Sequence, residues 1–327
     1  LLFRGRAALA LALLVIVFSL MTDSFFTMGN FTILIKHTSI TALLAVGSLF
    51  VMLTGGIDLS VGSVAGLSGM VAGGIISQGV RVAGHVYYPS IWVAIVTALC
   101  CGALVGWLNG FLETKLAVPS FIATLGTLYI ARGAALLSSN GRTFPGLGGL
   151  PARHNTGFPV LGEGAWLGIP NPVWVTCAIA VVAGVVASKT VFGRHVYATG
   201  GNERAAVLAG IDVNWLKVVC YIISGLCAAI VCLIIASELE SAHPATGETF
   251  ELTAIAAVVL GGASLNGGRG TIAGALLGAC VIGVLADGLV MMGISEFWQA
   301  VIKGGVIILA VAIDQMQSRV KTRLGGG

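Results

Sequence analysis

The stretch VMLTGGIDLSVGSVAGLSGMVAG, residues Val51–Gly73, is apolar enough to lie in a bilayer, yet it carries one carboxylate, Asp58. Gly55 and Gly56 stand just before that carboxylate and raise the backbone entropy cost of a helix there. Unwound backbone at membrane depth persists only where it is buried in protein or lines a wet cavity. The stretch therefore predicts two membrane helices joined by a turn that contains Asp58.

The composition of the whole chain is that of a membrane protein. Of its 327 residues, 57% are hydrophobic and only 9% are charged, whereas a soluble domain carries about 25% charged residues. The 47 glycines suit the close approach of transmembrane helices. The net charge of +4 is small and scattered, so it gives no indication of a nucleic-acid partner; the expected surroundings are membrane lipid.

Apolar runs predict an all-α integral membrane protein that forms one domain over residues 1–327. A helical span needs about 20 apolar residues, and the chain offers about ten such runs, some of them broken or re-entrant where glycines gather. The expected spans are at about 7–21, 33–54, 61–77, 90–111, 118–138, 172–190, 215–237, 250–264, 270–291 and 296–313.

The distribution of basic residues predicts the orientation. Arg4 and Arg6 precede the first span, further basic residues surround the segment 189–217, and others follow the last span at 319–323. Basic residues concentrate in cytoplasmic loops. We therefore expect both termini in the cytoplasm, and the Gly- and Pro-rich segment 139–171 outside as an irregular cap.

Two glycine-rich stretches resemble each other. LTGGIDLSVGSVAG (Leu53–Gly66) and LGGASLNGGRGTIAG (Leu260–Gly274) each place a Gly-Gly pair before a polar turn and a small-residue helix start. Transporters are often built from repeats, so two repeat halves at about 33–138 and 215–313 are one interpretation. A chance similarity between short glycine-rich segments is the other.

Asp58 allows several interpretations. A lone carboxylate at membrane depth is costly and indicates a function by default. Its oxygens can instead accept hydrogen bonds from the amides near Ser60 and Val61 and so hold the start of the next helix. Contact with a substrate and contact with a partner protein stay open. Farther along the chain, Asp287 and Lys303 are positioned to form an ion pair between the last two spans.

The sequence lacks the motifs of ATP-hydrolysing and metal-binding sites. There is no G-x-x-x-x-G-K-[ST] and no H-E-x-x-H, and AGVVASKT (Ala183–Thr190) lacks both glycines of a phosphate-binding loop. The seven cysteines lie in apolar runs without a C-x-x-C pair. We therefore expect no metal, no cofactor and no ATP hydrolysis on this chain.

Four stretches together resemble the ribose-type permease family, the membrane subunits of bacterial ATP-binding-cassette importers for simple sugars. The similarity covers nearly the whole chain. The stretches are GGIDLSVGS (Gly55–Ser63), VPSFIATLGTLYIARG (Val118–Gly133), FGRHVYATGGNERAAVLAGID (Phe192–Asp212) and FELTAIAAVVLGGASLNGGRGTIAGALLGA (Phe250–Ala279).

The resemblance implies a transport subunit of the bacterial inner membrane that is not itself an enzyme. It would move a monosaccharide-like solute inward, driven by ATP that is bound and hydrolysed by cytoplasmic partner subunits. A periplasmic binding protein would deliver the solute, and a second permease subunit, identical or similar, would complete the pathway.

The resemblance also implies an ATPase-coupling role for residues 192–214, which are too polar to span. Glu203–Leu208 is a helix-forming patch, and Ala205 and Ala206 offer small side chains that suit docking in a groove of the ATPase. An ordinary amphipathic surface turn is the alternative. The residues to which coupling is assigned are Gly193, Arg194, Gly200, Gly201, Asn202, Glu203, Arg204, Ala205, Ala206 and Gly210.

Polar residues inside the spans are candidates to line the path of the solute. Ser120 and Thr124 are one helical turn apart and so present their hydroxyls to the same side. Hydrogen bonding between helices is the alternative role for such residues. The candidate pathway residues are Asp58, Ser60, Asn109, Ser120, Thr124 and Asn266.

Two positions depart from the family pattern. Glu238 stands where the resemblance leads us to expect a basic residue, and Thr253 stands where it leads us to expect an acid. Neither the contacts of a binding protein nor one particular sugar is therefore carried over. A branched-chain amino acid or a nucleoside is the rival substrate, and a stand-alone secondary transporter is a further alternative. No paired catalytic residues support an intramembrane enzyme.

Overall fold

The computed structural model describes residues 6–153, 155–306, 308–309 and 312. Helices dominate it, as the sequence predicts, and the expected spans between 33 and 291 each correspond to a helix. The helices are α1 (Arg6–Met21), α2 (Met28–Leu53), α3 (Val61–Gln78), α4 (Ile91–Lys115), α5 (Ser120–Leu137), α6 (Asn171–Lys189), α7 (Val191–Gly201), α8 (Glu203–Leu208), α9 (Val213–Glu238), α10 (Phe250–Leu260) and α11 (Ile272–Met291).

The expected number of about ten spans is not confirmed. Within the described residues, seven helices are long and apolar enough to cross a membrane: α2, α3, α4, α5, α6, α9 and α11. Ala7–Met21 and Phe250–Leu260 are apolar but shorter. Residues 296–306 of the last expected span are helical, and part of that span lies outside the described residues.

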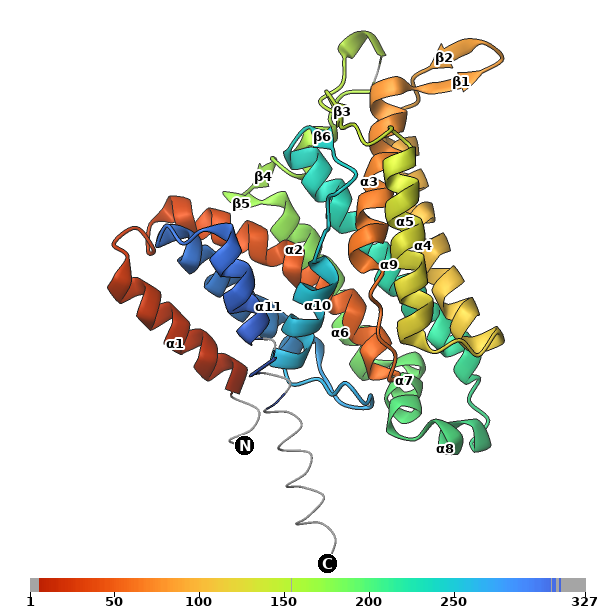
Figure 1. The fold of residues 1–327 in the computed structure, drawn as a ribbon, viewed down its shortest axis with the longest axis vertical. Coiled ribbons are helices and arrows are strands. Elements are labelled where there is room, and N and C mark those ends of the chain that lie inside the picture. The colour runs from red at the N-terminus through yellow and green to blue at the C-terminus, as the bar shows by residue number, and fades with distance from the viewer. Residues whose placement is uncertain (1–5, 154, 307, 310–311, 313–327) are drawn as a thin grey trace, which may run out of the picture.

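The two ends of the molecule differ (Figure 1). One end carries the short helices α7 and α8, and the opposite end carries small strands and irregular chain. The segment 139–171 forms the irregular cap that its glycines and prolines predict, anchored by the buried Leu147 and Phe158. The strands pair as β1 (Val80–Val82) with β2 (His85–Tyr87), β3 (Phe144–Pro145) with β6 (Ser241–Ala242), and β4 (Ala165–Trp166) with β5 (Ile169–Pro170).

The helix α9 is central to the packing, since it contacts α2, α3 and α4. Small residues bring α4 and α9 together: a Cβ at Gly106 would overlap the carbonyl of Tyr221, and a Cβ at Gly225 would overlap the carbonyl of Gly102. Membrane helices associate by such close approach rather than by hydrophobic burial. Side chains at the α4–α9 interface therefore have little room to move.

Ion pairing differs from the expectation in the last two spans. Asp287 accepts a hydrogen bond of 3.0 Å from the Asn30 amide on α2, and no ion pair joins it to Lys303 among the described residues. The predicted Asp287–Lys303 pair is therefore wrong. Glu238 pairs with Lys36 at 2.9 Å and so ties the end of α9 to α2.

Candidate functional site

The residues 54–60, which we call the first turn, join α2 to α3. The backbone leaves α2 through Gly55, whose φ of 86° lies in the region that favours glycine. Asp58 follows and is 3% exposed. Its Oδ1 accepts hydrogen bonds from the Ser60 amide at 2.9 Å and the Ser60 hydroxyl at 2.7 Å. Asp58 thus holds the turn, although Ser60 rather than Asp58 occupies the cap position of α3.

Three other helices hold this turn through buried polar side chains. From α9, the Ser224 hydroxyl donates to Asp58 Oδ2 at 2.8 Å. From α4, the Asn109 amide donates to the Ser60 hydroxyl at 2.8 Å, and Asn109 Oδ1 accepts from Thr127 of α5 at 2.6 Å. Both oxygens of Asp58 are engaged, which suits a buried carboxylate that must have partners.

Ser120 and Thr124 of α5 lie against the same turn. The Ile57 amide donates to Ser120 Oγ at 3.3 Å, and Thr124 Oγ1 donates to the Ile57 carbonyl at 3.1 Å. Five of the six candidate pathway residues, namely Asp58, Ser60, Asn109, Ser120 and Thr124, therefore meet at one place. Ser224 and Thr127 belong to the same network and were missed, because nothing in the sequence distinguishes them from other hydroxyls on apolar helices.

The side chain of the sixth candidate, Asn266, does not belong to this network, although a Cβ at Gly55 would lie 3.7 Å from the Asn266 carbonyl oxygen. Asn266 is exposed in the segment 261–271, which joins α10 to α11 and which we call the second turn. Backbone hydrogen bonds shape this turn: the Ser264 amide donates to the Arg269 carbonyl at 2.9 Å. The Gly268 amide donates to the carbonyl of Leu53, also at 2.9 Å. The second turn thus contacts the last residue of α2, and it also lies against the first turn, since a Cβ at Gly267 would be 2.9 Å from the Gly55 amide nitrogen.

The expected coupling segment folds into two capped helices. Asn202 accepts a hydrogen bond of 3.0 Å from the Ala205 amide and begins α8, whose bounds match the predicted patch Glu203–Leu208. Gly210, with a φ of 81°, follows its end. The preceding helix α7 was not expected; Thr190 caps it by accepting from the Gly193 amide at 3.2 Å.

The helix α7 touches the second turn and the last residue of α2, which directly precedes the first turn. A Cβ at Gly200 would overlap the carbonyl of Leu53 and the amide of Gly268, so only glycine fits there. One helical turn earlier, the Tyr197 hydroxyl donates to the carbonyl of Gly270 at 2.8 Å. Burial raises the pKa of Tyr197, so this hydroxyl keeps the proton that it donates.

The exposed surface of this segment differs from the expectation in one respect. Ala206 is 4% exposed and faces its own chain, so it does not belong to a free docking face. Ala205 is exposed, and Leu208 and Val207 on the same short helix are 89% and 56% exposed. Of the other assigned residues, Gly193 is buried, Gly200 is half-buried, and the following are exposed: Arg194, Gly201, Asn202, Glu203, Arg204 and Gly210.

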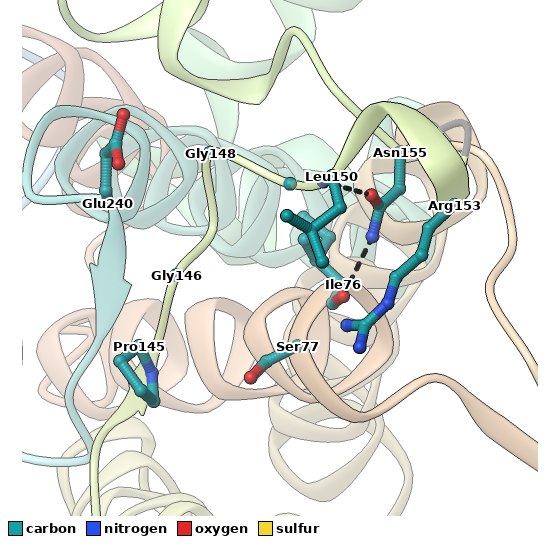
Figure 2. A pocket seen from close by; sticks show the side chains of 10 residues that line it. Ile76, Ser77, Pro145, Gly146, Gly148, Leu150, Arg153, Asn155 and Glu240 are labelled. Carbon is teal, nitrogen blue, oxygen red and sulfur yellow. Dashed lines mark hydrogen bonds between the residues drawn. The ribbon is translucent and has the colours of Figure 1, made fainter.

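A cavity of about 310 Å³ lies at the opposite end, beside the irregular cap. Figure 2 shows Asn155 joining two parts of its wall: it accepts from the Leu150 amide at 2.9 Å and donates to the Ile76 carbonyl at 3.0 Å. Arg153 also lines the cavity and lies over the ring of Tyr88, 4.1 Å from its centre. No group of His, Cys, Asp or Glu among the described residues could hold a metal ion.

Apolar helices packed around a buried polar turn define this chain as a multi-pass membrane protein. It belongs to the family described as branched-chain amino acid transport system / permease component, which matches residues 30–311. The chain is thus a transport permease subunit of the inner membrane.

Individual relatives sharpen this assignment. The ribose import permease protein RbsC of Bacillus subtilis (strain 168) is 44% identical over 310 residues, which cover 95% of this chain and 92% of the relative. The protein of the same name from Escherichia coli (strain K12) is 39% identical over 320 residues, 96% of this chain and 94% of the relative. The L-arabinose transport system permease protein AraH of Escherichia coli (strain K12) is 34% identical over 310 residues, 95% and 90% of the two chains. The resemblance to ribose-type permeases is confirmed. No solved structure matches this chain.

Proposed function

We propose that this chain is the permease subunit of an ATP-binding-cassette importer for a monosaccharide, with ribose as the first candidate. The observation that carries the proposal is the 44% identity, over 95% of the chain, to a protein named as a ribose import permease. A second relative of comparable coverage is named for L-arabinose. A pentose is therefore the chemical class to test first.

A separate ATPase subunit supplies the energy in this proposal. The sequence contains no phosphate-binding loop. The apolar side chains of Leu208 and Val207 stand exposed on α8, and such a helix can lay its apolar face in a groove of a partner. We therefore assign the α7–α8 end and both termini to the cytoplasm, in agreement with the basic residues there.

The opposite end faces the periplasm in this arrangement, where a binding protein delivers the sugar to the cap. A second permease subunit, identical or similar, completes the path. We assign the hydrogen-bonded residues around Asp58 to the support behind the wall of that path, since their polar groups are buried, are engaged by protein and hold the first turn in place. Asn266, whose side chain is exposed, is assigned to the mouth of the path.

Uptake into proteoliposomes tests the proposal. The permease is reconstituted with a candidate ATPase and a candidate binding protein from the same organism, and labelled ribose, arabinose, leucine and uridine are offered separately. We expect uptake of a pentose that requires ATP and all three components. Uptake driven by an ion gradient without the ATPase would contradict the proposal and indicate a secondary transporter.

A branched-chain amino acid is the second candidate substrate, because the family description names that class. The same proteoliposomes distinguish the two. Uptake of leucine without uptake of any sugar would assign this chain to the amino acid branch, with the membrane arrangement unchanged.

A further inference from the structure

Four polar side chains connect α8 with the first turn; we call Glu203, Lys217, Glu113 and Tyr221 the coupling chain. The ammonium of Lys217 lies 3.0 Å from Glu113 Oε1 and 3.0 Å from Glu203 Oε2. Lys217 stands near the start of α9, Glu113 near the end of α4, and Glu203 at the start of α8. One cation is therefore shared between two carboxylates that belong to different helices.

The two contacts of Lys217 are unequal. The side chains of Lys217 and Glu113 are 12% and 13% exposed, whereas that of Glu203 is 51% exposed. An ion pair in water contributes little to stability, but a largely buried carboxylate that loses its counter-charge is strongly destabilising. The ion pair with Glu203 can thus form or break at a small cost in free energy. Weakening the ion pair with Glu113, by contrast, leaves a largely buried carboxylate without its counter-charge.

Glu113 is linked to the first turn through Tyr221. Its second oxygen, Oε2, accepts a hydrogen bond of 2.6 Å from the hydroxyl of the fully buried Tyr221. That hydroxyl lies against the backbone of the turn, since a Cβ at Gly56 would be 2.8 Å from the hydroxyl oxygen. A shift of Glu113 therefore moves a group that touches the turn directly.

A single face of α9 carries this arrangement. Lys217, Tyr221 and Ser224 are spaced four and three residues apart, which places them on one side of the helix. Ser224 donates to Asp58 Oδ2 at 2.8 Å. The coupling chain thus runs from the exposed α8 to the backbone of the first turn at Gly56, and Ser224 on the same face of α9 holds the carboxylate of that turn.

We propose that the coupling chain links movement of α8 to the packing of the first turn. This inference rests on the proposed function, in which the ATPase subunit binds α8. When that subunit displaces α8, the ammonium of Lys217 is redistributed between Glu203 and Glu113. The changed counter-charge at Glu113 alters its hydrogen bond to Tyr221 and so the packing of the turn at Gly56. Lys217 and Glu113 are positioning residues that touch neither ATP nor sugar.

The test compares variants of the assembled transporter in proteoliposomes. In Lys217→Met the shared cation is removed, and we expect the stimulation of ATP hydrolysis by loaded binding protein to fall about fivefold or more, the low end of ordinary coupling between two sites. The sugar moved per ATP should fall as well. Lys217→Arg keeps the charge and should keep the coupling.

Two further variants separate coupling from folding. Because Lys217→Met leaves Glu113 without a counter-charge, the double variant Lys217→Met, Glu113→Gln restores a neutral interior and keeps an acceptor for Tyr221. We expect it to fold and to bind the ATPase, yet to remain uncoupled. Lys115→Met is the matched control: Lys115 ends the same helix, is exposed, and forms no ion pair within the described residues, so coupling should stay at the wild-type level.

A second measurement does not depend on sugar uptake. Hydrogen exchange of residues 54–60 is followed by mass spectrometry as the ATPase subunit and ATP are added. We expect exchange to change in the wild type and in Lys115→Met, and not in the double variant. Normal coupling in the double variant, or an unchanged response of the turn, would overturn the inference. Lack of ATP-driven uptake by the wild type would instead count against the proposed function. The response of hydrogen exchange in residues 54–60 would still test the role of the coupling chain.

Discussion

The first and second turns share a glycine pattern and lie at the same end of the molecule, but they are held by different means. The first turn is held by side chains: Asp58 is 3% exposed and both its oxygens accept hydrogen bonds. The second turn is held mainly by backbone hydrogen bonds, to which the hydroxyls of Tyr197 and Ser264 add one each, and its polar side chains Asn266 and Arg269 are exposed.

The difference follows from the surroundings of the two turns. Backbone groups that reach water need no partner from the protein, whereas those that are buried must be satisfied internally. The glycines allow close approach in both, as at Gly268, whose amide meets the Leu53 carbonyl. Of the two turns, the buried first turn is the one that contains a carboxylate, with buried hydroxyls around it. A similar glycine pattern thus predicts a similar backbone shape. The role of each turn depends on its side chains.

The largest effect is expected from Asp58→Leu. This change leaves the Ser60 amide and the hydroxyls of Ser60 and Ser224 without their acceptor, and each buried group left unsatisfied costs about 1–3 kcal/mol. We expect a clear drop in the thermal unfolding temperature in detergent and loss of transport. Asp58→Asn keeps one acceptor oxygen and should be milder. Equal and complete loss of transport in both variants, at the wild-type unfolding temperature, would mean that the charge itself contacts substrate or partner.

An intermediate effect is expected from Gly200→Ala. The added Cβ would overlap Leu53 and Gly268 and force α7 away from the end of α2 and from the second turn; overpacking of this kind costs about 1–3 kcal/mol. Transport should fall and the unfolding temperature should decrease. Gly201→Ala is the matched control, since a Cβ at Gly201 meets nothing within 4 Å. If the two variants behave alike in both assays, the contact of α7 with the end of α2 and the second turn has no role.

The smallest effect is expected from Asn266→Ala. The side chain is exposed and donates no hydrogen bond to the described residues, and surface substitutions usually change stability by less than about 0.5 kcal/mol. The unfolding temperature should stay near wild type, and uptake should change less than in the other variants, since Asn266 is one exposed side chain at the mouth of the proposed path. Loss of uptake as complete as that of Asp58→Leu, with stability unchanged, would weaken the contrast between the turns.

The sequence predicts the helices well where length and hydropathy define them. The span expected at 61–77 is α3, Val61–Gln78, and the patch Glu203–Leu208 is α8. The helix α7 was missed because it is short and interrupted by polar residues and glycines. The repeat halves, about 33–138 and 215–313, stay a prediction.

The candidate site was predictable only in part, for a physical reason. Asp58 stands out as a lone carboxylate in an apolar run. Its partner Ser224 and the cluster of Glu113, Lys217 and Tyr221 come from distant segments that only the packing of α4 against α9 brings together. Local pattern carries no signal for such pairs.

The proposed coupling to an ATPase subunit depends most on α8 facing the cytoplasm, where ATP is available to a partner. Single cysteines are introduced at Leu208, which is 89% exposed, and at Tyr87, which is 56% exposed at the opposite end, in a variant whose seven native cysteines are replaced. A membrane-impermeant maleimide is then added to right-side-out and inside-out membrane vesicles. The account predicts that Leu208→Cys reacts only in inside-out vesicles and Tyr87→Cys only in right-side-out vesicles. Reaction of Leu208→Cys in right-side-out vesicles would contradict it.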